Sequence, residues 1–118
     1  MIMFDEKSEY IKIQDSAWEI ISNLDDETPD TQELKQALEY LGSLELWVEN
    51  GNNILLYQRA KTLLGIELCL ILLDDYIDAK EYYQKLKNLT PTFATPRKEE
   101  LKYLQEQGWK LMSSLSEN

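Results

Sequence analysis

The feature that most constrains this chain is an apolar run from Leu63 to Leu73, with the sequence LLGIELCLILL. One charged side chain, Glu67, interrupts it. A helix that is hydrophobic all round must be covered on several sides by other elements. The run is also well short of the roughly 20 residues that a membrane span requires. We therefore predict a buried helix over about residues 54–73, at the centre of the fold.

The segments on either side carry apolar residues three and four positions apart, the spacing of amphipathic helices. Glycine and proline, which mark turns, number only 4 and 3 among 118 residues, and this scarcity favours few long helices over many short strands. We predict one all-α domain spanning residues 1–118, with about five antiparallel helices arranged as a helical bundle or as a stack of hairpins. The predicted helices cover residues 6–23, 29–49, 54–73, 76–89 and about 96–115.

Short polar segments mark the expected helix ends. The pair Thr28-Pro29 fits the cap and the first position of a helix, and Thr31 is an alternative cap one turn later. Gly51 suits the left-handed conformation that follows many helices, and either residue of Asn52-Asn53 is expected to cap the next helix. The pair Thr95-Pro96 repeats the first start signal before the last helix.

The residue types that are missing exclude several kinds of site. Histidine is absent and cysteine occurs once, at Cys69. The chain therefore lacks the commonest general base and the commonest transition-metal ligand, and it cannot form an internal disulfide. We expect no enzymatic activity, no cofactor and no metal site, with Cys69 an inert core residue. Since no apolar signal core follows the N-terminus, we expect a cytoplasmic protein that does not bind membranes.

Three aspartates follow the apolar run, at Asp74, Asp75 and Asp78. Their spacing resembles the aspartate-rich pattern with which isoprenoid synthases hold magnesium and a diphosphate, because Asp74 and Asp78 would share one face of a continuous helix. The chain has no second acidic motif and no basic cluster beside the first one to hold the diphosphate. The alternative is a turn in which Asp74 or Asp75 caps the following helix, and this is the interpretation that we favour.

Residues 63–91 contain aromatic, small and proline residues in a recurrent spacing. These residues are Tyr76, Ala79, Tyr83, Leu86 and Pro91. In this spacing the segment resembles the second half of a tetratricopeptide repeat. The resemblance implies that Ala79 lets a paired helix approach closely and that Tyr83 wedges between neighbouring hairpins. Glu67 stands where that family usually has a small residue, so a regular tandem array is not expected.

The net charge of −10 argues against binding to nucleic acid. Residues 1–34 hold ten acidic and two basic side chains, whereas residues 79–118 hold five acidic and seven basic ones. We predict that the acidic region meets a basic surface on a protein partner. Tyr82 is a further surface candidate, because Tyr82 and Tyr83 are adjacent and cannot both face inward. The predicted partner-binding residues are Asp15, Glu19, Asp25, Asp26, Glu27, Asp30, Glu33 and Tyr82.

The three tryptophans, Trp18, Trp47 and Trp109, each lie on or beside an apolar stripe. We expect them to pack in the core. The alternative is that one of them anchors a partner protein, because tryptophan is enriched at binding hot spots.

Two non-enzymatic hypotheses follow. In the first, the chain is an inhibitor or immunity-type protein that neutralises a basic partner, such as a nuclease toxin or a nucleic-acid-binding machine, with fast and salt-sensitive association. In the second, it is a tetratricopeptide-like adaptor or secretion chaperone that binds a peptide in a helical groove, with weak dependence on salt. Neither hypothesis fixes the oligomeric state.

Overall fold

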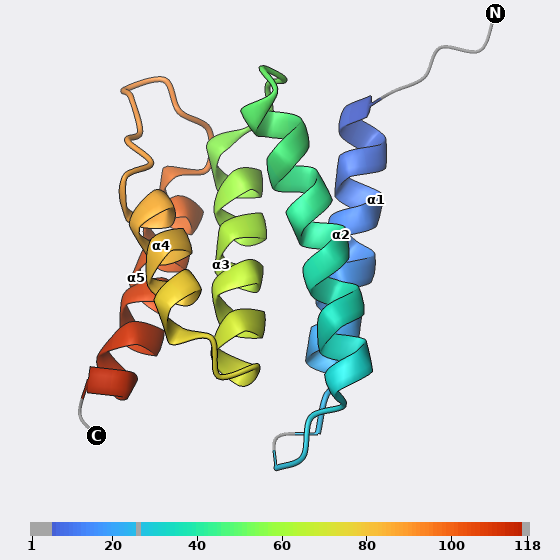
Figure 1. Cartoon of the computed structure of the whole chain (residues 1–118). Helices are drawn as coiled ribbons and strands as arrows, with labels where there is room; N and C mark the ends of the chain where they lie inside the picture. The colour runs from blue at the N-terminus through green and yellow to red at the C-terminus, as the bar shows by residue number, and fades with distance from the viewer. Residues whose placement is uncertain (1–5, 26, 117–118) are drawn as a thin grey trace, which may run out of the picture.

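The computed structural model describes residues 6–25 and 27–116, and this part of the chain forms five α-helices and no strand (Figure 1). The prediction of an all-α fold with five helices is therefore confirmed, and each predicted helix end falls within two residues of the observed one. The helices are α1 (Glu6–Ser22), α2 (Thr31–Glu49), α3 (Leu56–Leu72), α4 (Tyr76–Lys87) and α5 (Lys98–Ser116).

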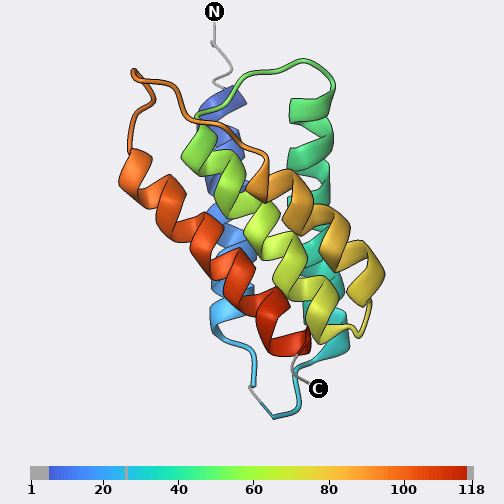
Figure 2. The same cartoon turned by 90° about the vertical axis from the view of Figure 1, so that its left-hand side faces the viewer.

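Helix α3 lies at the centre, as its apolar sequence predicts. It contacts each of the other four helices, with α1 and α2 on one side and α4 and α5 on the other (Figures 1 and 2). Among the described residues, the backbone of α1 stays apart from that of α5, and the backbone of α2 from that of α4, so α3 makes the main connection between the two outer pairs. Such a helix needs an apolar surface on all sides.

Two groups of buried side chains cover α3. One group lies mainly between α1, α2 and α3 and reaches Ala79 of α4, and the other lies mainly between α3, α4 and α5. Cys69 is buried in the first group, as predicted, and burial raises the pKa of its thiol to about 12. The most completely covered apolar side chains of α3 are Ala60, Leu63, Ile66 and Cys69.

Two ion pairs connect α2 to the helices beside it. The guanidinium of Arg59 on α3 donates two hydrogen bonds to the buried Glu45 carboxylate, at 3.0 Å to Oε1 and 2.7 Å to Oε2. The ammonium of Lys85 on α4 lies 2.6 Å from Oε1 of Glu49, on the same side of α3. In the first pair the Glu45 carboxylate is buried and the Arg59 side chain is partly buried, so its two parallel bonds contribute more than an exposed pair would.

The start of α2 differs from the expectation. Asp30 is the N-cap, and its Oδ1 accepts hydrogen bonds from the backbone N–H groups of Gln32, at 2.8 Å, and Glu33. Neither Thr28 nor Thr31 has this role. A short aspartate next to the first turn presents an acceptor and a negative charge to the positive end of the helix, so it competes well with a threonine.

The connection from α2 to α3 is also only partly as expected. Gly51 has φ of +101°, so the left-handed position is confirmed. Asn52 does not cap α3; its side chain donates a hydrogen bond to the Trp47 carbonyl at 2.8 Å and thus closes the end of α2. Leu55 stands at the N-cap of α3 without a side-chain bond, so packing rather than capping fixes where this helix starts.

The start of α5 also lies later than the Thr95-Pro96 signal indicates. Thr95 Oγ1 accepts a hydrogen bond from the backbone N–H of Thr92 at 2.7 Å, which closes a turn inside the loop. Arg97, with φ of 56°, follows this turn, and the helix begins at Lys98. The threonine therefore orders the loop rather than the first turn of the helix.

Candidate functional site

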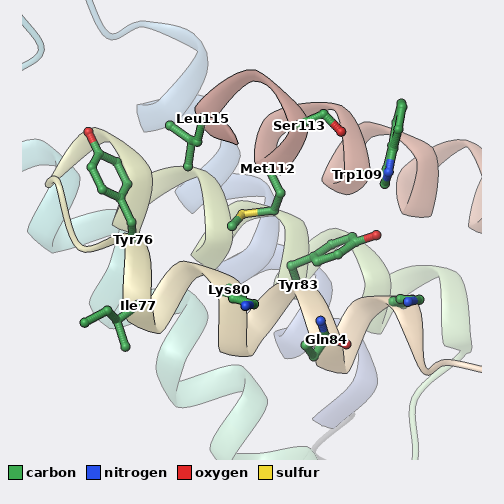
Figure 3. A pocket seen from close by; sticks show the side chains of 10 residues that line it. Tyr76, Ile77, Lys80, Tyr83, Gln84, Trp109, Met112, Ser113 and Leu115 are labelled. Atoms are coloured by element: carbon green, nitrogen blue, oxygen red, sulfur yellow. The ribbon is translucent and has the colours of Figure 1, made fainter. Parts of the chain in front are cut away.

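An open groove of about 810 Å³ runs along the outer side of the α4–α5 pair. Figure 3 shows its residues: Met112 extends from α5 toward α4, and the ring of Tyr83 extends from α4 toward the end where Trp109 stands. Tyr76, Ile77 and Leu115 lie at the other end (Figure 3). Helix α4 supplies Tyr76, Ile77, Lys80, Tyr83, Gln84 and Lys87, and α5 supplies Trp109, Met112, Ser113 and Leu115.

The α4 side of the groove follows from helical periodicity. Ala79 and Leu86 are fully buried, and Tyr82, three residues after Ala79, packs against both core groups. These positions form one face of α4. The next face around the helix, which includes Tyr83, is left to line the groove.

Tyr82 therefore does not have the exposed position expected of it. Its ring is partly buried against the core, with the Lys85 ammonium 4.9 Å from the ring centroid. The two adjacent tyrosines do differ in orientation, as expected, but it is Tyr83 that faces the groove. Both tyrosines lie about one turn after the buried Ala79, and it is the packing of α4 that turns Tyr82 toward the core groups and leaves Tyr83 on the groove.

Helix α5 turns one face to α3 and another to the groove. Leu101 and Gly108 are buried, and Leu104 and Leu111 pack against the second core group. Trp109 follows Gly108 by one residue, which rotates it about 100° around the helix. Its side chain is 56% exposed and lines the groove, so the expectation of core packing is wrong for Trp109.

The other two tryptophans are in the core, as expected. Trp18 packs against both core groups, and its Nε1–H donates a hydrogen bond to the Lys61 carbonyl at 3.1 Å. Trp47 packs against the first group, with its ring centroid 5.8 Å from that of Tyr10. Both indoles thus hold helices together, and neither is available to a partner in the way that Trp109 is.

A buried carboxyl group lies behind the groove. Glu67 of α3 is fully buried, and neither of its oxygens has a hydrogen-bond partner among the described residues. It adjoins Gly108 of α5, which also adjoins Tyr83 in the groove wall. Burial raises the pKa of Glu67 to about 8, so the group is mostly a neutral acid at pH 7. The sequence carries a signal for this group, a single acidic residue inside an apolar helix.

The charges along the groove are all of one sign. Lys80 and Lys87 line it, and no acidic residue belongs to its lining among residues 6–25 and 27–116, although the chain holds 22 aspartates and glutamates. The acidic residues gather elsewhere. Residues 6–49, which include α1 and α2, hold twelve acidic and three basic side chains, whereas residues 50–116 hold eight acidic and nine basic ones. Since α1 and α2 lie on one side of α3 (Figure 1), the excess of acidic residues lies on that side.

The predicted acidic residues occupy exposed positions on α1, on the loop after it and on the start of α2. Asp15 lines a separate shallow groove that also contains Lys61 and Arg97, so cations lie near it. Asp25 accepts hydrogen bonds from the backbone N–H groups of Glu27, at 2.8 Å, and Thr28, which lowers the pKa of its carboxyl. Asp26 lies outside the described residues. The exposed predicted residues are Asp15, Glu19, Asp25, Glu27, Asp30 and Glu33.

The three aspartates after α3 form a turn, which is the interpretation favoured from the sequence. Asp74 has φ of 63°, and its carboxylate accepts a hydrogen bond from the Tyr76 hydroxyl at 2.9 Å. Asp75 is the N-cap of α4 and accepts a hydrogen bond from the Asp78 N–H at 3.2 Å. Across the described ranges, acidic and cysteine side chains form no group suited to holding a metal ion.

Comparisons of the chain with protein-family models, with curated proteins and with solved structures gave no match. Within residues 6–25 and 27–116, no helix combines the length and the apolar character that crossing a bilayer requires.

Proposed function

We propose that this chain is a non-enzymatic protein-binding protein, of the adaptor or chaperone kind, which holds a helical segment of its partner in the α4–α5 groove. The observation that carries this proposal is the gathering of large, exposed apolar side chains in one groove. Ile77 is 85% exposed and Trp109 is 56% exposed, and Tyr76 lies on the same side. Covering such side chains contributes about 25 cal/mol for each Å² of apolar surface removed from water.

The shape of the groove favours a helix as the bound element. Its walls are two antiparallel helices whose lining residues recur at helical spacing, and such ridges receive the side chains of a third helix. Among the described helices, α5 contacts only α3 and α4. No third described helix lies over the groove between α4 and α5. The α4 wall from Tyr76 to Lys87 is about 16 Å long, or three helical turns.

A matched pair of variants tests this proposal. Ile77→Asp places a charge in the groove, and Leu46→Asp places the same charge on α2, where the side chain is 58% exposed and outside the groove. The wild-type chain is used to select peptides from a displayed library of amphipathic helices. We expect selected peptides to lose at least 10-fold in affinity for Ile77→Asp and to bind Leu46→Asp as they bind the wild type. Peptides that bind all three chains with equal affinity would contradict the proposal that the groove is the binding site.

The second candidate is the inhibitor or immunity-type function, and the charge distribution favours it. The excess of acidic residues on α1, α2 and their connection suits a basic partner surface, which would associate quickly at low salt. The test is a variant with Glu19, Glu27 and Glu33 changed to glutamine, because none of these side chains caps a helix. A basic partner captured by the wild type should associate at least 10-fold more slowly with this variant at low ionic strength, and equally at high ionic strength. An unchanged rate at low salt would exclude this candidate.

A further inference from the structure

We infer that the helix bound in the α4–α5 groove carries acidic residues along the edge that faces α4, where they pair with Lys80 and Lys87. This inference rests on the proposed function and adds the chemistry of the partner. The two lysines are seven residues apart on α4, which places them on the same side of the helix and about 10 Å apart along its axis. Acidic residues two turns apart on a bound helix match that spacing.

Lys80 and Lys87 have no ionic partner among the described residues, and they combine this with a place in the lining of an apolar groove. Among the described residues, Lys85 pairs with Glu49, and Lys110 pairs with Glu106 on its own helix. Neither Lys80 nor Lys87 forms a described ion pair. No described residue of the groove lining is acidic, so the part of the chain that the structure describes does not neutralise these two ammonium groups within the groove.

An unpaired cation beside an apolar groove selects among partners. A bound helix would remove water from both ammonium groups, and a charge that loses water without gaining a partner destabilises the complex. A helix with carboxylates at the matching positions restores the lost interactions, whereas one with lysines there adds repulsion. The apolar residues of the groove thus supply affinity, and Lys80 and Lys87 supply the preference for an acidic partner.

The same charges disfavour a second copy of this chain as the occupant. Two copies that paired symmetrically through this groove would bring both pairs of lysines into one interface. A partner helix with acidic residues on one edge meets the groove without that repulsion.

The test is a displayed library of helical peptides with a fixed apolar stripe and with two flanking positions, seven residues apart, varied among Glu, Gln and Lys. Baits are the wild type, the double variant Lys80→Glu/Lys87→Glu, and the control Lys7→Glu/Lys35→Glu. The control changes the net charge equally on α1 and α2, where both lysines are exposed. We expect at least 10-fold enrichment of Glu over Lys with the wild type and the control. We expect the opposite preference with the groove variant.

The possible results separate the two proposals. Peptides that depend on Ile77 but show no preference among Glu, Gln and Lys would overturn the inference and leave the proposed function standing. Selection of no peptide that depends on Ile77 would overturn both. Sedimentation velocity of the wild type is the last check: a dimer that Ile77→Asp converts to a monomer would identify a second copy as the occupant and overturn the inference.

Discussion

Glu67 and Gly108 are packed so closely that Oε1 of Glu67 lies 2.9 Å from the point where a β-carbon on residue 108 would stand. Cδ2 of Leu86 lies 2.6 Å from the same point, and Cδ1 of Tyr83 lies 3.4 Å from it. Helices α3, α4 and α5 therefore meet at a position that only glycine fits without movement of its neighbours. The carboxyl group lies inside this junction, with no described hydrogen bond, directly behind the groove wall.

The position of Glu67 predicts that stability falls as the pH rises. Its pKa in the folded chain is about 8, above the ordinary value of 4.5. Between these values the folded chain keeps a proton that the unfolded chain has released. The free energy of unfolding should therefore decrease by up to about 1.4 kcal/mol for each pH unit from about pH 5 to pH 8, and the loss is complete above pH 8.

Urea unfolding at pH 5, 6, 7 and 8 measures this dependence. Glu67→Gln, which cannot ionise, should flatten the decrease, whereas Glu39→Gln, at an exposed position of α2, should leave it unchanged. Equal slopes for the wild type and Glu67→Gln would contradict the assignment.

The Gly108 junction predicts opposite effects for two glycine substitutions. Replacing glycine by alanine inside a helix ordinarily stabilises it by about 1 kcal/mol. Gly42 on α2 has open space around the position of a β-carbon, so Gly42→Ala should raise the free energy of unfolding by about 0.5–1 kcal/mol. Gly108→Ala must displace the buried Leu86 side chain and Glu67, and overpacking of this kind costs about 1–3 kcal/mol.

Chemical unfolding of both variants at pH 6, where Glu67 is protonated, gives the comparison. A Gly108→Ala chain as stable as Gly42→Ala would mean that the three helices are less closely packed than described.

The sequence predicts the helices and their order because burial repeats with helical periodicity. The run from Leu63 to Leu73 identifies the central helix, and Ala79 and Leu86 are buried where the spacing of α4 places them. The pattern does not determine which of two adjacent residues faces the core. Tyr82 and Tyr83 are both aromatic, and only the three-dimensional packing around Ala79 decides which of them faces α3.

The groove itself is a property of two helices together. It exists because α4 and α5 both pack on α3 while their outer faces stay apart, and Trp109 lines it because Gly108 has the buried position. No single-helix pattern contains that information. In the same way, Glu45 falls within the apolar stripe of α2, but its partner Arg59 is fourteen residues away on another helix.

The Glu45–Arg59 pair predicts a large effect when one partner is removed. Arg59→Met leaves the Glu45 carboxylate buried without its two charge-assisted hydrogen bonds, and breaking a buried pair in this way costs about 3–5 kcal/mol. The double variant Glu45→Leu/Arg59→Met removes both charges and should recover most of the loss. Arg59→Lys keeps the charge but not the two parallel bonds, so it should fall between the single variant and the wild type.

Urea unfolding of the wild type, Glu45→Leu, Arg59→Met and the double variant at pH 7 completes a double-mutant cycle, with Arg59→Lys measured beside them. A loss below about 1 kcal/mol for Arg59→Met would place this pair among ordinary surface ion pairs.

The buried hydroxyl of Thr62 links α1 to α3 by hydrogen bonds. We therefore expect its removal to lower the free energy of unfolding. The Tyr10 hydroxyl hydrogen-bonds to Thr62 Oγ1, Gln14 Nε2 donates to the same oxygen at 2.9 Å, and Thr62 Oγ1 donates to the Gln58 carbonyl at 3.3 Å. Thr62→Val has nearly the same shape but leaves the Tyr10 hydroxyl and one Gln14 N–H without that acceptor. Each buried group left in this way costs about 1–3 kcal/mol.

Three variants separate the hydrogen bonds from the shape of the side chain. Thr62→Ser keeps the oxygen and loses one methyl group, so it should cost only about 1 kcal/mol. Thr62→Val leaves the Tyr10 hydroxyl without an acceptor, and Tyr10→Phe removes that hydroxyl. The double variant Tyr10→Phe/Thr62→Val should therefore lose less free energy of unfolding than the sum of the losses of the single variants. Tyr10 also has a pKa raised to about 12 by burial, and absorbance titration of Tyr10→Phe should therefore lack one phenol that ionises late. If Thr62→Val is as stable as the wild type, the hydroxyl contributes nothing to the packing of α1 on α3.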